Sequence, residues 1–164
     1  MSKSLEIEYT NLIKSHEGII HKVIGLYVDH QEDKKDLFQE IMLQGWKSFK
    51  NFKKTSLFST WLYRVSLNTV LNFNKKRKIV EDLDVVQNKA DGSYSENLDE
   101  TELLYRIVRS LNEIDKMLMT LHLEGYKNKE IAGITGMTQN HINVKLHRLK
   151  QTVVEQFKAA YNGK

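Results

Sequence analysis

Two amino-acid types are missing from this chain of 164 residues, which contains no cysteine and no proline. The absence of cysteine excludes disulfide bonds, thiolate zinc sites, iron–sulfur clusters and a cysteine nucleophile. Average proline usage is about 5%, so roughly eight prolines would be expected in a chain of this length. Because proline breaks helices and builds turns, a chain without it favours an all-α fold.

Long apolar runs are missing as well. The longest uninterrupted apolar run has three residues, for example Ile41-Met42-Leu43, whereas a membrane-spanning helix needs about 20. The N-terminal stretch MSKSLEIEYTNLIKSHEG has no apolar segment of the kind that secretory signals contain. We therefore expect a cytoplasmic protein without membrane insertion.

Patterns that carry catalysis are the third absence. The six histidines form no H-E-x-x-H motif and no pair at a spacing of four residues. His16 and His122 lie on apolar stripes, which is typical of core histidines. No Walker loop, G-x-S-x-G elbow or dinucleotide glycine motif occurs. We expect neither an enzyme nor a metal site, and no cofactor.

The chain is instead rich in helical periodicity. Apolar residues recur at spacings of three and four over residues 5–28, 32–49 and about 59–76, which predicts three amphipathic helices. Asp33 or Asp36 is expected at the start of the second helix, and Ser59 or Thr60 as the N-cap of the third.

Further helices are predicted around residues 103–111, 117–121, 128–135 and 139–158. No sustained alternation of period two predicts a strand. The fold class is therefore all-α.

The net charge of +4 is an average over three different segments. Residues 1–80 carry a net charge of +6 and residues 103–164 a net charge of +5, whereas residues 81–102 carry eight acids and one base. This composition predicts two small helical domains, 1–80 and 103–164, joined by a flexible acidic linker. Each basic domain has an electrostatic reason to meet DNA.

The stretch 126–150 has the pattern of a helix-turn-helix. Ala132, in the first short helix, is small enough to let two helices cross closely. Gly136 follows, where a tight turn needs a residue that tolerates a positive φ. Thr138 stands where the second helix needs an N-cap.

The second helix of this pattern has a buried face and a polar face. Its inward residues are Ile142, Leu146 and Leu149. Its outward residues are Gln139, Asn140, Asn143, Val144, His147, Arg148 and Lys150. Amide side chains pair with adenine edges and basic ones with guanine or phosphate, so this face predicts a recognition helix in the major groove. The alternative is a helical hairpin with a solvated polar face.

Two segments of the N-terminal half carry further signals. Residues 36–46 read DLFQEIMLQGW, which alone would also fit a solvated acidic face. Residues 57–68 read LFSTWLYRVSLN and follow a loop rich in Phe and Lys. Aromatic rings interleaved with positive charge suit single-stranded nucleic acid, because the nucleobases stack on the rings and the phosphates contact Lys and Arg side chains. A core helix anchored by tryptophan would show the same residue types.

Taken in order, these segments resemble the bacterial sigma factors of the extracytoplasmic-function (ECF) group. The two N-terminal segments are similar to region 2 of that family, and residues 110–150 are similar to region 4. The resemblance implies a non-catalytic subunit that gives RNA polymerase its promoter specificity. Such a subunit binds core polymerase, recognises −35-type and −10-type promoter elements and promotes DNA melting.

The resemblance also implies which residues do this. Docking on the β′ clamp helices of core polymerase is assigned to Asp36, Gln39, Glu40, Leu43 and Trp46. Binding of the −10-type element is assigned to Phe52, Lys53, Lys54, Arg64, Asn68, Lys75, Lys76 and Arg77. Binding of the −35-type element is assigned to Gln139, Asn140, Asn143, Val144, Lys145, His147 and Arg148.

Within these sets, Phe52 and Asn68 are expected to capture an unstacked base, because a ring offers a stacking face and an amide reads a base edge. Trp61 is expected to pack in the core rather than to wedge DNA. The implied partners are core polymerase, including its β flap, promoter DNA in double-stranded and single-stranded form, and an anti-sigma factor.

The sequence departs from the family pattern at several positions. Leu111-Asn112 stands where region 4 usually opens with Leu-Pro, and Asn143 and Val144 replace a basic residue and Ser in the recognition helix. The family's promoter preference is therefore not transferable. Thr135 replaces the usual Leu before the turn glycine, and we expect it to loosen that domain slightly.

Two other classes of protein share these features. One is a free-standing helix-turn-helix regulator that binds duplex DNA without polymerase, usually as a dimer. The other is a helical protein-interaction domain. A complex with core polymerase separates the sigma factor from both.

Overall fold

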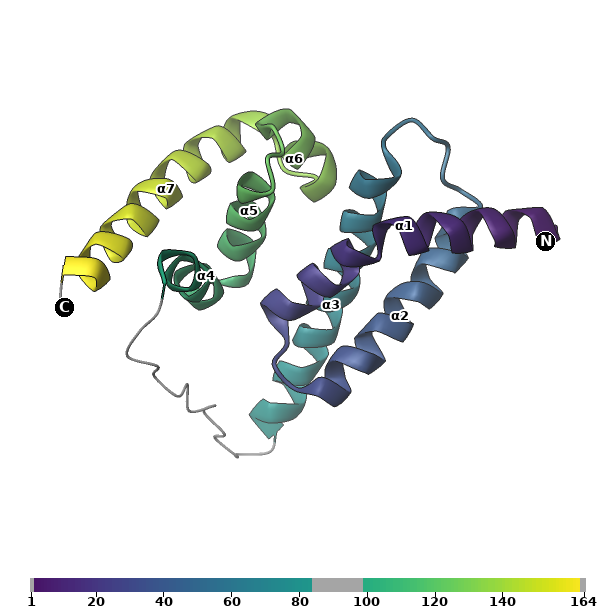
Figure 1. Ribbon diagram of the computed structural model, residues 1–164, viewed down its shortest axis with the longest axis horizontal. Coiled ribbons are helices and arrows are strands. Elements are labelled where there is room, and N and C mark those ends of the chain that lie inside the picture. The colour runs from purple at the N-terminus through teal and green to yellow at the C-terminus, as the bar shows by residue number, and fades with distance from the viewer. Residues whose placement is uncertain (1, 84–98, 163–164) are drawn as a thin grey trace. The chain divides into compact units, whose positions relative to one another are not determined.

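The structure is a computed structural model, which describes residues 2–83 and 99–162. Across these residues the chain forms seven helices and no strand, so the predicted all-α class is confirmed. The chain divides into two compact units, Met1–Ile79 and Val80–Lys164. Figure 1 labels the helices, and each unit is described by itself. No helix of the described residues is long and apolar enough to cross a membrane.

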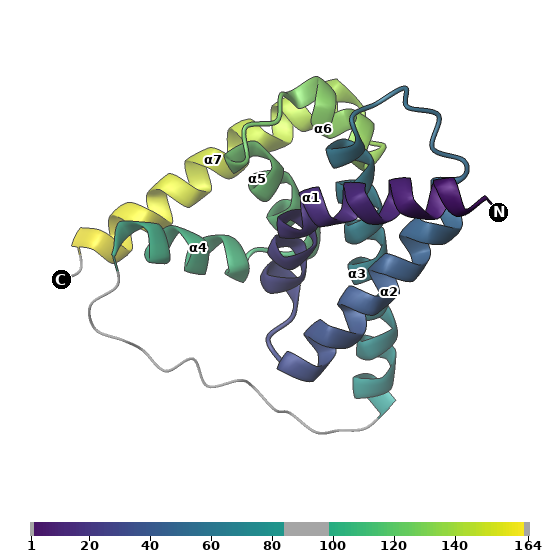
Figure 2. The same ribbon diagram turned by 45° about the vertical axis from the view of Figure 1, so that its right-hand side comes forward.

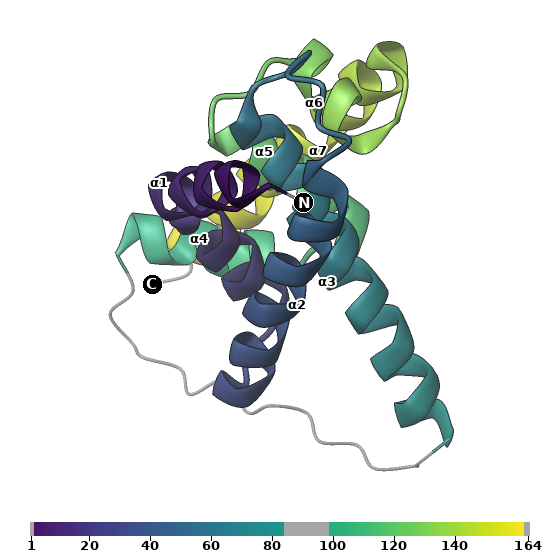
Figure 3. The same ribbon diagram turned by 90° about the vertical axis from the view of Figure 1, so that its right-hand side faces the viewer.

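The first unit contains α1 (Lys3–Tyr27), α2 (Gln31–Phe49) and all but the last turn of the long α3 (Phe58–Leu83). Helices α1 and α2 form an antiparallel hairpin, and α3 runs beside α2 (Figures 2 and 3). The apolar stripes of the three helices meet in a core whose fully buried members include Ile20, Leu37, Ile41, Leu62 and Val70. Burying stripes of this kind is what holds short helices together, since isolated helices are marginal in water.

The predicted start of the second helix is confirmed, and the predicted cap of the third is wrong. Helix α2 begins at Gln31 with His30 as its N-cap, and Asp33 lies in its first turn. There its carboxylate still interacts favourably with the helix dipole. Helix α3 begins at Phe58, before the predicted cap residues Ser59 and Thr60, and continues past the predicted end at residue 76. No glycine or proline occurs between residues 58 and 83 to stop it.

The α1–α2 hairpin is closed by a contact that depends on a glycine. The Tyr9 hydroxyl donates a 2.7 Å hydrogen bond to the backbone oxygen of Met42. Gly45 is buried beside it, and a Cβ atom at that position would overlap the Tyr9 hydroxyl. The Tyr9 ring also packs against Trp46 and Phe49, with ring centroids 5.3 and 5.1 Å apart. Burial raises the pKa of Tyr9 to about 12.

The second unit contains α4 (Glu100–Ser110), α5 (Glu113–Leu123), α6 (Asn128–Thr135) and α7 (Gln139–Asn162). Figure 2 shows α4 lying along the C-terminal half of α7. The core is built from one face of each helix and includes Val108, Leu118, Ile131, Ile142 and Leu146. The inward stripe predicted for the last helix is thus correct.

Asp99 and Asn112 cap the starts of α4 and α5 with their side chains. The Asp99 carboxylate accepts a 2.7 Å hydrogen bond from the Glu102 N–H, and the Asn112 side chain accepts one of 2.9 Å from the Asp115 N–H. Because of the Asp99 cap, α4 begins at Glu100, inside the segment predicted to be linker. Residues 84–98 of that segment lie outside the described residues.

Candidate nucleic-acid interfaces

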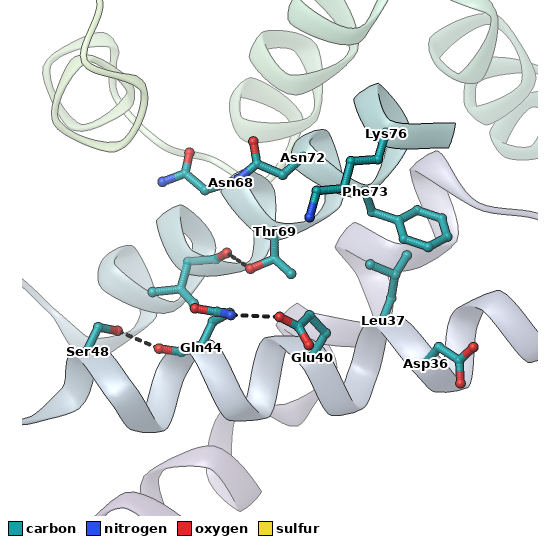
Figure 4. Close-up of a pocket in the computed structure, with 11 residues that line it drawn as sticks. Asp36, Leu37, Glu40, Gln44, Ser48, Asn68, Thr69, Asn72, Phe73 and Lys76 are labelled. Atoms are coloured by element: carbon teal, nitrogen blue, oxygen red, sulfur yellow. Dashed lines mark hydrogen bonds between the residues drawn. The ribbon is translucent and has the colours of Figure 1, made fainter. Parts of the chain in front are cut away.

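An open groove of about 670 Å³ lies between α2 and α3 (Figure 4). From α2 it is lined by Asp36, Leu37, Glu40, Gln44 and Ser48. From α3 it is lined by Val65, Asn68, Thr69, Asn72, Phe73 and Lys76. The groove therefore brings together residues from two predicted sets, the polymerase-binding set and the −10-type set.

Two hydrogen bonds along α2 order one wall of the groove. The Gln44 amide donates to the Glu40 carboxylate over 2.7 Å, and the Ser48 hydroxyl donates to the Gln44 backbone oxygen over 2.9 Å (Figure 4). Gln44 and Asn72 were not among the predicted residues. Each lies four positions after a predicted one, Glu40 and Asn68, so helical spacing was the signal that could have found them.

The outer face of α2 presents most of the predicted polymerase-binding residues. Asp36, Gln39 and Glu40 are exposed, and Leu43 is 47% exposed, which is unusual for a large apolar side chain. Trp46 is half-buried because its ring packs against Tyr9. The α2 surface is thus an acidic face with one apolar side chain in its middle.

The loop between α2 and α3 packs an aromatic cluster. The Phe52 ring lies 5.3 Å from the Trp61 ring and 6.0 Å from the Phe58 ring, measured between centroids. Trp61 and Phe52 are both half-buried, so each ring packs against its neighbours and remains partly accessible. Phe52 is therefore a packed ring and not a free aromatic side chain.

Lys54 is the most constrained residue of this loop. Its φ of 56° lies in the left-handed region, the only such value at a non-glycine residue in the described part of the chain. Its ammonium group pairs with the Glu8 carboxylate of α1 at 2.7 Å. Nothing local in the sequence indicates this pair, because 46 positions separate the two residues. Lys53 beside it is exposed.

The basic end of α3 is partly tied to α2. Arg77 pairs with Asp33 at 3.2 Å, and both side chains are about one-third exposed, 38% and 32%. Lys75 and Lys76 are exposed, as is Arg64 earlier on the helix. Arg77 is thus held by a carboxylate, while Arg64, Lys75 and Lys76 are exposed and, among the described residues, have no ion pair.

The turn of the helix-turn-helix has the predicted chemistry. Gly136 has a φ of 77°, and its N–H donates to the Ala132 oxygen over 2.9 Å. The Thr138 hydroxyl accepts from the His141 N–H over 3.2 Å, so the predicted N-cap is correct. Thr135 has a role that the sequence analysis missed. Its hydroxyl donates to the Ile131 oxygen and accepts the Met137 N–H, which ties the turn at both ends.

The recognition-helix residues of α7 differ in their solvent exposure and in whether their side chains contact other helices. Gln139, Asn140, Val144, His147 and Arg148 are exposed. Asn143 is exposed as well, but its side-chain oxygen accepts a 2.6 Å hydrogen bond from the Asn128 amide of α6.

Lys145 is half-buried and pairs with Asp115 of α5 at 3.1 Å. Behind this face, burial together with the charge of Lys150 holds the pKa of His122 below its ordinary value. Among the described residues no group of three or more His, Cys, Asp or Glu could hold a metal ion.

Comparison with known families decides the identity. The family model for Sigma-70 region 2 matches residues 12–79, and the model for Sigma-70 region 4 matches residues 101–153. The chain is 30% identical to the ECF RNA polymerase sigma-E factor of Escherichia coli (strain K12), over 87% of this chain and 82% of the relative. The chain belongs to the ECF sigma factors. The sigma-E factor of Haemophilus influenzae is 26% identical over 87% of this chain and 83% of the relative.

Solved structures agree with this fold. The sigma factor RpoE, in complex with the anti-sigma factor NepR from Bartonella quintana, matches with a TM-score of 0.69 and 18% identity, over 96% of this chain and 98% of that one. CnrH, in complex with the cytosolic domain of CnrY, matches with a TM-score of 0.64 and 14% identity, over 97% and 90%.

The sigma factor is thus a promoter-specificity subunit of bacterial RNA polymerase, which binds core polymerase and promoter DNA and promotes initiation. Its groove lies within the region 2 match, and its helix-turn-helix lies within the region 4 match. A free-standing helix-turn-helix regulator is not favoured, because the match to sigma regions extends over both halves of the chain.

Proposed function

We propose that the α2–α3 groove is the place where this sigma factor joins polymerase docking to recognition of the −10-type element. The supporting observation is that Asp36 and Glu40 of the docking set line the same groove as Asn68 and Lys76 of the DNA set. On this proposal the outer face of α2, with Gln39, Leu43 and Trp46, binds the β′ clamp helices. The acidic residues contribute charge attraction, and exposed Leu43 contributes apolar contact.

The melted −10-type strand would follow α3. Arg64, Lys75 and Lys76 are exposed along this helix and suit phosphate contacts. Lys53, Lys54 and Arg77 would join them, the last two after release from their carboxylate partners. A base leaving the stack would meet the accessible part of the Phe52 ring, on which it can stack, and the exposed amide of Asn68, which can read a base edge.

The −35-type element would be bound as duplex by α7. Its N-terminal residues Gln139 and Asn140 are exposed next to the helix start, and Val144, His147 and Arg148 continue that face. An exposed Val offers apolar contact to a thymine methyl, and Arg pairs with guanine or phosphate. Lys145 would act differently from its neighbours, because its pair with Asp115 leaves it positioning α7 rather than holding a phosphate.

The sigma factor would act by binding alone, with no catalytic step of its own, in the cytoplasm where promoter DNA and polymerase are found. An anti-sigma factor is a proposed partner, and the support for it is that the similar RpoE and CnrH structures are complexes of this kind.

Matched variants on the two walls of the groove test the proposal. The double variant Asp36→Asn/Glu40→Gln should weaken binding to core polymerase at least fivefold, since each lost charged contact is worth about 1 kcal/mol or more. Asn68→Ala should leave polymerase binding unchanged but reduce open-complex formation, measured by permanganate footprinting of melted thymines. The control is Asn11→Ala on exposed α1, which should change neither readout. Wild-type polymerase affinity in the double variant would refute the docking half of the proposal, and unchanged melting with Asn68→Ala would refute the other half.

A further inference from the structure

Side chains from two neighbouring helices hold the recognition helix α7 on opposite flanks. On one side, the Asn128 amide nitrogen of α6 donates to the Asn143 side-chain oxygen over 2.6 Å. On the other, Asp115 of α5 pairs with Lys145 at 3.1 Å. Positions two apart lie about 200° apart around an α-helix. The two contacts therefore fix how α7 is rotated about its own axis.

The Asn128 contact also fixes which edge of the Asn143 amide is free. A carboxamide carries its acceptor oxygen and its donor NH₂ group on opposite sides. Because the Asn143 oxygen is turned toward Asn128 and gives it one of its two lone pairs, the NH₂ group is the edge that keeps its full bonding capacity for another partner. Asn143 is exposed, so that NH₂ edge is available to DNA.

A donor edge selects bases differently from a free amide. A free Asn pairs with adenine through two hydrogen bonds, of which one needs the Asn oxygen as acceptor for the adenine N6 amino group. An NH₂ group alone finds two acceptors at guanine, N7 and O6, but a single acceptor at adenine N7 or thymine O4, and it finds only a donor at cytosine N4. Holding the oxygen of Asn143 thus removes the pairing by which asparagine favours adenine.

We propose that Asn128 is a positioning residue for promoter specificity, which orients Asn143 so that the −35-type element carries guanine in preference to adenine at the contacted base. Asn128 acts through Asn143 and reads no base itself. This inference rests on the proposed function, because it takes α7 as the helix that binds the −35-type element.

The test uses holoenzyme reconstituted from the full chain and bacterial core RNA polymerase. Wild-type holoenzyme first selects its preferred promoter from a randomised promoter library by run-off transcription and sequencing of the transcribed templates. The −35-type positions of that promoter are then randomised, and base ratios are compared for the wild type, Asn128→Ala, Asn128→Asp, Asn143→Ala and the Asn128→Ala/Asn143→Ala double variant. Lys129→Ala is the matched control, since Lys129 is an exposed neighbour on the same helix. Thermal unfolding verifies that each variant is folded.

The expected results differ for each variant. Asn128→Ala frees the Asn143 oxygen, so the guanine-to-adenine ratio should fall about fivefold or more at one position. The Asp of Asn128→Asp can only accept, so it should draw the Asn143 NH₂ group toward itself and turn the oxygen outward, which shifts preference to adenine or cytosine. Its added negative charge lowers affinity for all sequences alike and leaves the ratios readable. Lys129→Ala should keep the wild-type ratios.

Several results would overturn the inference. Unchanged ratios in both Asn128 variants would show that Asn128 does not orient Asn143. Unchanged ratios in Asn143→Ala would show that Asn143 reads no base, and an effect of Asn128→Ala that persists without Asn143 would show a different route. If wild-type holoenzyme shows no base preference at all upstream of the −10-type element, the proposed function of α7 fails as well. If it shows one that Asn143→Ala abolishes and the Asn128 variants do not change, this inference alone fails.

Discussion

Lys54 combines a strained backbone with one of the positive charges predicted to bind the −10-type element. A left-handed conformation costs a residue with a Cβ atom roughly 1–2 kcal/mol, and glycine avoids this cost. We expect Lys54→Gly to be more stable than Lys54→Ala by about 1 kcal/mol in free energy of unfolding. Both variants lose the exposed ion pair with Glu8 equally, so the difference isolates the backbone. Urea denaturation measures it, and equal stabilities would show that the loop does not hold residue 54 at positive φ in solution.

Tyr9 should make the first unit less stable as the pH rises above about 10. Its pKa is about 12 in the folded chain and about 10 when unfolded, so between these values the folded state keeps a proton that the unfolded state loses. The free energy of unfolding should therefore be unaffected below pH 10 and fall as the pH rises from about 10 to about 12.

The Tyr9→Phe variant checks the origin of this pH dependence. It should lose the Tyr9 part of the fall, because phenylalanine has no proton to lose, and it should cost about 1 kcal/mol at neutral pH through the lost hydrogen bond to Met42. Tyr105→Phe is the matched control, since Tyr105 is 48% exposed. Urea denaturation across the alkaline range gives the comparison. A fall of the same size in Tyr9→Phe and in the wild type would contradict the assignment.

The helix-turn-helix offers a matched pair of glycines at the scale of the element. Gly136 has a φ of 77°, so Gly136→Ala should lower the free energy of unfolding by about 1 kcal/mol. Gly133 lies inside α6, and a Cβ there meets no atom of the described residues within 4 Å. Gly133→Ala should therefore raise stability by roughly 0.5–1 kcal/mol. Thermal unfolding of both variants gives the comparison, and effects of the same sign would contradict the assigned turn.

For single helices and turns, the sequence could predict only the features that depend on residues close together in the chain. Helical period located the inward face of the last helix, and turn chemistry located Gly136 and Thr138, because both depend on residues a few positions apart. The start of α3 shows the limit. Ser59 and Thr60 are suited to capping, yet the helix begins one residue earlier, at Phe58.

The resemblance to the family predicted which residues belong to the site, but it did not predict which other side chains those residues contact. The resemblance placed Asn143 and Lys145 on the recognition helix. Their partners Asn128 and Asp115 come from other helices, and the register between helices is set by how whole faces pack. The same holds for Glu8 and Lys54. Which predicted DNA residues are free and which are held could therefore be learned only from the folded chain.

At the scale of the whole molecule, the sequence alternates in charge: an acidic segment stands between two basic ones. Residues 1–80 and 103–164 are basic, while residues 81–102 carry eight carboxylates. Replacing these eight by their amides would change the net charge from +4 to +12. Asn at position 99 would preserve the cap of α4, since asparagine caps as well as aspartate does. The variant thus changes charge while keeping the described helix start.

The charge-neutralised chain should bind duplex DNA of arbitrary sequence more tightly than the wild type, by severalfold at low salt, because the acidic segment no longer offsets the basic units. The gain should shrink as salt is added, since the screening length is only about 10 Å at 0.1 M ionic strength. Fluorescence anisotropy with one labelled duplex at two salt concentrations measures both effects. Equal affinities at low salt would mean that the basic units meet DNA beyond the reach of the acidic segment. In that case the weak binding of DNA expected of a free sigma factor would have to arise within the units themselves, where Asp33 and Glu8 already hold two of the cations that the DNA would need.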